Sequence, residues 1–121
     1  MWRVLLVAFL IAHGGVHLAI WLSPAKPEAP FLASHSWLVG NQRGLAVGFA
    51  VVAASLLVAG GVGLWMGGSW WRFVGLTGLV ASFLAMILFF HPWFIPIQVI
   101  NAGLIFALLL QDWPTQAMVG A

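Results

Sequence analysis

The chain has 121 residues, of which 64% are apolar and 5% are charged, with a formal net charge of +2 and a mean hydropathy of +1.11. Because about a quarter of the residues of a soluble domain are charged, this composition indicates an integral membrane protein and argues against a nucleic-acid partner. The chain has no cysteine, which excludes disulfides, thiol chemistry and thiolate-bound iron or zinc.

Four apolar runs are each long enough to cross a membrane, which takes about 20 residues. The predicted helices are, in chain order, residues 2–22, 45–66, 73–90 and 93–110. A long loop, residues 23–43, joins the first two; prolines forbid a regular helix at its start, and its second half could lie along the membrane surface. The links "GGSWWR" and "HPW" are so short that they make their helices antiparallel neighbours.

The chain is therefore expected to be a single transmembrane domain, residues 1–121, folded as an all-α, four-helix up-down bundle with both termini on one side. Arg3 and Arg72 share the side of the free amino terminus, whereas Lys26 and Arg43 lie on the other. Positive charge favours the cytoplasmic face, so we expect cytoplasmic termini. Tryptophans near the predicted helix ends indicate an interfacial aromatic belt formed by Trp2, Trp21, Trp37, Trp65, Trp70, Trp71, Trp93 and Trp113.

Small residues recur along one face of three predicted helices, a pattern that lets another helix backbone approach closely within a membrane. They are Ala8, Ala12, Gly15 and Ala19 in the first helix; Gly44, Gly48, Ala53, Gly60 and Gly63 in the second; and Gly75, Gly78, Ser82 and Ala85 in the third. No phosphate-binding or dinucleotide-binding motif accompanies these glycines, so they are interpreted as packing surfaces.

Polar side chains interrupt two of the spans at matching depths. His13 and His17 continue a helical stripe that begins with Leu6 and Leu10, and the last helix carries Gln98 and Asn101 three residues apart on one face. Counted from the ends of their helices at about 1.5 Å per residue, His17 is level with Gln98 and His13 with Asn101. Unpaired imidazoles and amides are costly in hydrocarbon, so these four side chains are expected to pair inside the bundle, His17 with Gln98 and His13 with Asn101.

Several roles for this polar cluster stay open. His13 and His17, four residues apart, could hold a metal ion with His91 or His35 completing the site, although no carboxylate lies nearby. Haem needs axial ligands from opposite faces, so one of the pair would act alone or with His91; a quinone or pigment could also use one histidine. The alternatives are interhelical hydrogen bonds without a ligand, and a pathway for protons or a small solute.

Enzymatic activity is not expected. No Asp, Glu, Lys or Arg lies at the centre of a span, and the two acidic residues, Glu28 and Asp112, lie outside the spans at opposite ends. Acid–base chemistry would therefore depend on histidine alone, and an ion-coupled transporter would lack its usual carboxylate.

The first two helices, "WRVLLVAFLIAHGGVHL" and "RGLAVGFAVVAASLLVAGGVGLWMG", resemble small bacterial four-helix membrane proteins, distantly the DoxX-like group. The resemblance implies the fold and a bacterial inner membrane, and adds no catalytic residue. We expect a binding or accessory subunit, of a respiratory or photosynthetic complex or of a homo-oligomer, with the bilayer and other membrane subunits as partners. The alternatives are a homo-oligomeric channel or permease, and a haem- or metal-binding protein.

Overall fold

A computed structural model describes residues 1–22 and 35–120 of the chain. Its elements, in chain order, are α1 (Trp2–Leu22), β1 (His35–Ser36), β2 (Gly40–Asn41), α2 (Arg43–Trp65), α3 (Trp71–Leu88), the 3-10 turn η1 (Pro92–Phe94), α4 (Ile95–Leu110) and α5 (Gln116–Val119). Four segments are long and apolar enough to cross a membrane: α1, α2, α3 and, as one span, η1 with α4 (Pro92–Leu110). Their ends differ from the predicted ones by two residues or fewer.

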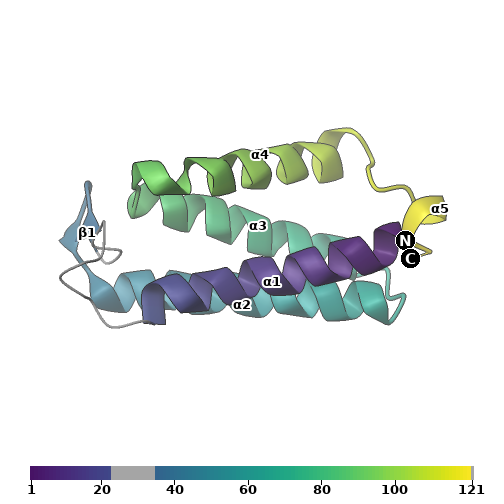
Figure 1. Cartoon of the computed structure of the whole chain (residues 1–121), viewed down its shortest axis with the longest axis horizontal. Coiled ribbons are helices and arrows are strands. Elements are labelled where there is room, and N and C mark those ends of the chain that lie inside the picture. The colour runs from purple at the N-terminus through teal and green to yellow at the C-terminus, as the bar shows by residue number, and fades with distance from the viewer. Residues whose placement is uncertain (23–34, 121) are drawn as a thin grey trace.

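The predicted up-down arrangement is confirmed. Each long helix packs antiparallel against the next in the chain, α1 on α2, α2 on α3 and α3 on α4, and the two termini meet at one end of the bundle (Figure 1). We call this the terminal end and the opposite one the hairpin end. Which of them faces the cytoplasm remains a prediction.

Glycines bring the helix backbones of the bundle into contact. A Cβ atom placed on Gly60 of α2 would lie 2.8 Å from Gly75 Cα on α3, and one placed on Gly14 of α1 would lie 3.0 Å from the Ala54 carbonyl oxygen on α2. Such separations leave no room for a side chain, so the predicted use of small residues for packing is confirmed for α3, where Gly75, Gly78, Ser82 and Ala85 are all buried. By contrast, Ala8, Ala12, Gly15 and Ala19 of α1 are exposed.

Helix α4 is the least embedded of the four spans. Only 17% of its most apolar stretch is buried, against 39% in each of the other three, and it packs mainly on α3. Asn101 is its one buried residue. On its other side a groove of about 430 Å³ separates α4 from α1, lined by Trp2, Leu5, Leu6, Phe9, Ile100, Gly103 and Leu104.

The second part of the long loop contains structure that the sequence interpretation did not foresee. β1 and β2 form an antiparallel hairpin in which His35 is opposite Asn41 and Ser36 is opposite Gly40. Gly40 closes the turn with a φ of 75°, a conformation that favours glycine. The predictions for the proline-rich start of the loop and for Lys26 and Glu28 fall outside the described residues, and so does part of the second half that was expected along the membrane surface.

The terminal end is covered by the C-terminal segment. Val119 of α5 is buried in an apolar cluster with α1, and Arg3 donates hydrogen bonds to the carbonyls of Leu64 and Trp65 at the end of α2. Arg72 donates to the Pro114 carbonyl and lies 3.8 Å from the Asp112 carboxylate. Arg3 and Arg72 thus share one end of the bundle, as the charge analysis predicted.

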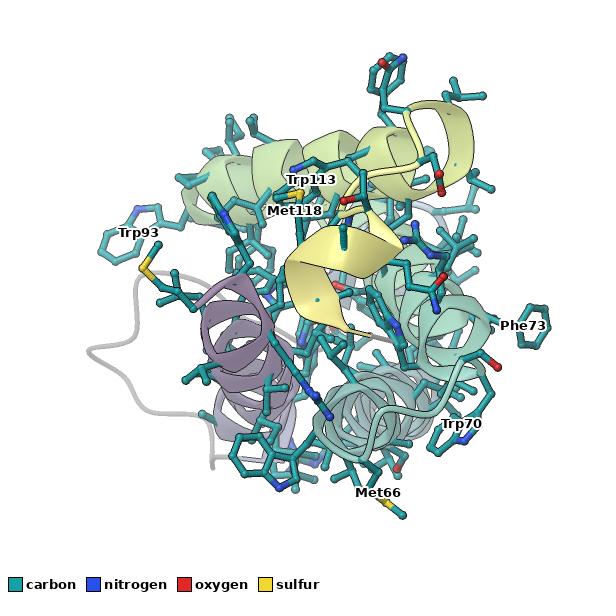
Figure 2. The ribbon with its side chains drawn as sticks, turned by 90° about the vertical axis from the view of Figure 1, so that its right-hand side faces the viewer. Met66, Trp70, Phe73, Trp93, Trp113 and Met118 are labelled. Carbon is teal, nitrogen blue, oxygen red and sulfur yellow. The ribbon has the colours of Figure 1, made fainter. Side chains whose placement is uncertain are left out.

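The tryptophans form a belt only in part. Trp2, Trp37, Trp65, Trp70 and Trp93 are exposed, and Figure 2 shows Trp93 pointing away from the bundle, like Phe73 of α3. Trp21 and Trp71 are 1% and 2% exposed and belong to the core, so the belt prediction is wrong for them. Each lies at a helix end, but its indole turns inward and covers the end of the apolar interior.

Candidate functional site

The two histidines of α1 lie on its buried face. His13 is 6% exposed and His17 is fully buried, and they continue the stripe of Leu6 and Leu10. This position separates two apolar clusters, one towards the terminal end around Leu57 and Leu79 and one towards the hairpin end around Met86. The polar side chains therefore form a layer inside an otherwise apolar bundle.

A continuous chain of hydrogen bonds joins α1, α3 and α4 in this layer. His13 Nε2 is 2.8 Å from Asn101 Oδ1, Asn101 Nδ2 donates to Ser82 Oγ at 2.8 Å, and Ser82 Oγ is 2.7 Å from His17 Nε2. Asn101 Nδ2 also donates to Gln98 Oε1 at 3.1 Å, while Gln98 Nε2 donates to the Phe83 carbonyl at 3.2 Å. We call these five side chains the polar clasp: His13, His17, Ser82, Gln98 and Asn101.

The direction of the chain follows from its carbonyl acceptors. The His13 carbonyl, 2.8 Å from His17 Nδ1, can only accept, so His17 carries its proton on Nδ1 and its Nε2 accepts the Ser82 hydroxyl proton. The Ser82 oxygen in turn accepts from the Asn101 amide, and the Asn101 oxygen accepts from His13 Nε2. With this assignment each hydrogen bond of the clasp has one donor and one acceptor.

Of the two hydrogen bonds predicted from the sequence, the structure confirms one and corrects the other. His13 bonds Asn101, as matching depth predicted, but the hydrogen bond predicted between His17 and Gln98 is wrong. His17 bonds Ser82 instead, because α3 presents a hydroxyl at that level within reach of the imidazole. Ser82 was treated only as a small packing residue; a hydroxyl inside a stripe predicted to be buried needs a partner, and that signal could have identified it.

Aromatic rings extend the histidine stripe along α1. Phe9 stacks on His13 and Trp21 stacks on His17, with ring centroids 5.2 and 5.6 Å apart and interplanar angles of 18° and 24°. Trp21 then contacts Phe94 at 5.6 Å. Both imidazoles are therefore held by rings four residues away as well as by hydrogen bonds, and their rotamers are fixed.

The other two histidines lie apart from the clasp. His35 Nδ1 is 2.8 Å from Asn41 Oδ1 in the exposed hairpin, and His91 Nδ1 accepts from the Trp93 amide. Across the described residues, no three His, Cys, Asp or Glu side chains come together in a way that could hold a metal ion. Neither His91 nor His35 therefore completes a three-histidine metal site with His13 and His17; Trp21 stacks on His17, and Phe94 contacts both Trp21 and His91.

The bundle is closely packed on the terminal side of the clasp. The cavity there has a volume of about 10 Å³ and is lined by apolar side chains from α1, α3 and α4 and by Trp113 and Pro114. A buried water needs at least about 10–15 Å³ and two or more polar partners. This cavity is therefore too small and too apolar to hold an ordered water between the clasp and the terminal end.

Fold and site together define an all-α, multi-pass membrane protein with four candidate spans, whose buried histidines bond Asn101 and Ser82 across three helices. Comparisons with protein-family models, curated proteins and solved structures found no match. The resemblance to the DoxX-like group therefore stays a prediction.

Replacing Ser82 with alanine should cost about 1–2 kcal/mol of unfolding free energy, because both the Asn101 amide and His17 Nε2 lose a partner. Threonine at this position keeps the hydroxyl and should lose less. Unfolding in mixed micelles measures both variants. Equal losses for alanine and threonine would show that the cost comes from packing and not from the hydroxyl.

Proposed function

We propose that this protein is a small membrane subunit that binds another transmembrane helix through the outward face of α1, and that the polar clasp is structural. The observation that carries the proposal is the exposure of Ala8, Ala12 and Gly15 along that face. The bound helix belongs to a larger membrane complex or to a second copy of the chain.

The glycines support this assignment because they divide into two groups. Where helices of the bundle meet, a Cβ on Gly14, Gly60 or Gly78 would lie 3.0 Å or less from backbone atoms. A Cβ on Gly15 would meet nothing within 4 Å. Small residues on a lipid-facing helix surface permit the close backbone approach that drives association in membranes, where burial of apolar surface supplies little.

Larger side chains border this face of α1. Val4, Ile11 and Val16 are 56%, 41% and 39% exposed, so they form ridges beside the smooth stripe of Ala8, Ala12 and Gly15. A partner helix lying along the stripe would pack between these ridges. The interface would run along the middle of α1, opposite its histidine face.

The clasp geometry supports a structural role over the alternatives. Both ring nitrogens of His17 and the Nε2 of His13 are hydrogen-bonded, so a metal or haem that bound any of these three nitrogens would have to break an existing contact. A permeation path through the bundle would have to open the apolar packing between His13 and the terminal end. The clasp instead joins α4 to α1 and α3 by hydrogen bonds. These bonds fix the rotation of α1 in the bundle, so its small-residue face stays directed outward.

Ala12→Leu and Gly15→Leu should abolish helix association while leaving the bundle as stable as the parent protein. Chemical crosslinking in native membranes, followed by mass spectrometry of the products, identifies whether the lost partner is another protein or a second copy. Ala102→Leu, a matched change on the exposed surface of α4, should leave the crosslinks intact. Crosslinks that persist in both α1 variants would refute the proposed interface.

A further inference from the structure

The hairpin of β1 and β2 carries an apolar tip. Trp37, Leu38 and Val39 are 66%, 60% and 42% exposed, and none of them is charged. Polar side chains follow directly at the base of the hairpin, at Asn41 and Gln42, and Arg43 begins α2. The hairpin is thus amphipathic along its length, with its apolar part at the turn.

A hydrogen bond fixes the tip against the bundle. The Trp37 indole Nε1 donates to the Ile87 carbonyl at 2.6 Å. Ile87 lies in the last turn of α3, where the final carbonyls of a helix lack an intrahelical donor. Trp37 therefore satisfies a helix-end carbonyl and holds the tip at the level where a candidate membrane span ends.

Two backbone amides of the tip are hydrogen-bonded within the turn, as a region poor in water requires. The buried Ser36 hydroxyl accepts from the amides of Leu38 and Val39 at 3.1 and 3.3 Å. Unpaired backbone amides are costly where water is scarce, and this turn leaves neither of these two unpaired.

The rest of the hairpin end also exposes apolar side chains. Phe90 and Trp93 at this end are 48% and 65% exposed. Figure 1 shows the hairpin standing across the end of the bundle opposite the termini, and indole side chains favour the headgroup level of a bilayer. Exposed aromatic side chains therefore stand both at η1 and at the hairpin tip, at the same end of the bundle.

We propose that the tip, Trp37, Leu38 and Val39, inserts into the interfacial layer of the phospholipid bilayer, with Trp37 setting its depth. The tip binds lipid and does not dock a soluble protein. This inference is independent of the proposed partner on α1, because it concerns a different surface at one end of the bundle.

The chain has no cysteine, so a single Leu38→Cys substitution carries one nitroxide label without further changes. In phosphatidylcholine and phosphatidylglycerol vesicles, power-saturation EPR compares the accessibility of the label to oxygen and to a water-soluble nickel chelate. We expect oxygen to dominate at Leu38→Cys. The nickel chelate should dominate at Gln42→Cys, and Val99→Cys on the exposed surface of α4 serves as the lipid reference.

Two results would overturn the proposal. Nickel accessibility at position 38 equal to that at position 42 would place the tip in water, and shielding from both reagents would indicate a protein contact.

In the Leu38→Cys background, Trp37→Phe keeps an apolar ring but removes the donor to Ile87, so the accessibility of the label should shift towards the Gln42→Cys value. Trp93→Phe, the matched control, should leave it unchanged. An unmoved label in Trp37→Phe would refute the role of Trp37 in setting depth.

Discussion

Asn101→Leu should lower the free energy of unfolding by about 2–4 kcal/mol and release α4 from the bundle. The Asn101 amide makes hydrogen bonds to His13, Ser82 and Gln98, and it is the only buried residue of α4. Leucine has a similar size, so the cost comes from the polar groups of α1 and α3 that lose their partner. Gln98, the other clasp residue of α4, donates to the Phe83 carbonyl of α3, but no hydrogen bond within the described residues joins it to α1.

Release of α4 is measured separately from stability. Nitroxide labels on Leu84→Cys of α3 and Phe106→Cys of α4, both exposed positions, report the distance between the two helices. The distribution should be narrow in the parent protein and broad in Asn101→Leu. Val99→Ala, a truncation of an exposed α4 side chain, should change stability by less than about 0.5 kcal/mol. If Asn101→Leu behaved like Val99→Ala, the clasp would not hold α4.

Gly60→Leu should destabilise the bundle by about 3 kcal/mol or more. The nearest atoms to a Cβ on Gly60 are the Cα and N of Gly75, at 2.8 and 3.0 Å, and a backbone cannot turn away as a side chain can. Helices α2 and α3 would have to separate along their length. Unfolding in mixed micelles, together with the distance between labels on Val62→Cys and Phe73→Cys, measures the effect.

Gly48→Leu is the matched control for this change. Gly48 lies in the same helix, and a Cβ there would meet nothing within 4 Å. Both substitutions gain the same helix propensity over glycine, which is somewhat less than the roughly 0.8–1 kcal/mol that separates alanine from glycine. A loss of stability in Gly48→Leu as large as that in Gly60→Leu would contradict the assignment of Gly60 as the close contact between α2 and α3.

The fold could be predicted because its signals are local. Length and apolarity define each span, short links make neighbours antiparallel, and a helix rises evenly, so matching depth was enough to pair His13 with Asn101. Depth alone does not say which helices are adjacent. The prediction paired α1 with α4 alone, whereas α3 also takes part and contributes the hydroxyl that His17 bonds.

The features that could not be predicted depend on how each helix is rotated about its axis and on contacts between residues far apart in the sequence. Residue type does not tell whether a small-residue stripe faces another helix of the chain or the lipid, and the stripe of α1 faces outward while that of α3 is buried. Similarly, Trp21 and Trp37 both flank a span, yet one is core and the other is exposed. The hairpin was missed because its strands are two residues each, too short for a periodic pattern.

The groove between α1 and α4 has a consequence for the protein outside its native membrane. The groove is lined by apolar side chains, so in a bilayer the hydrocarbon tails of neighbouring lipids would fill it and add packing contacts that the chain does not supply itself. Delipidation during purification would then loosen α4 before any other helix. Such a preparation would retain its helical content and still have lost the arrangement of its fourth span.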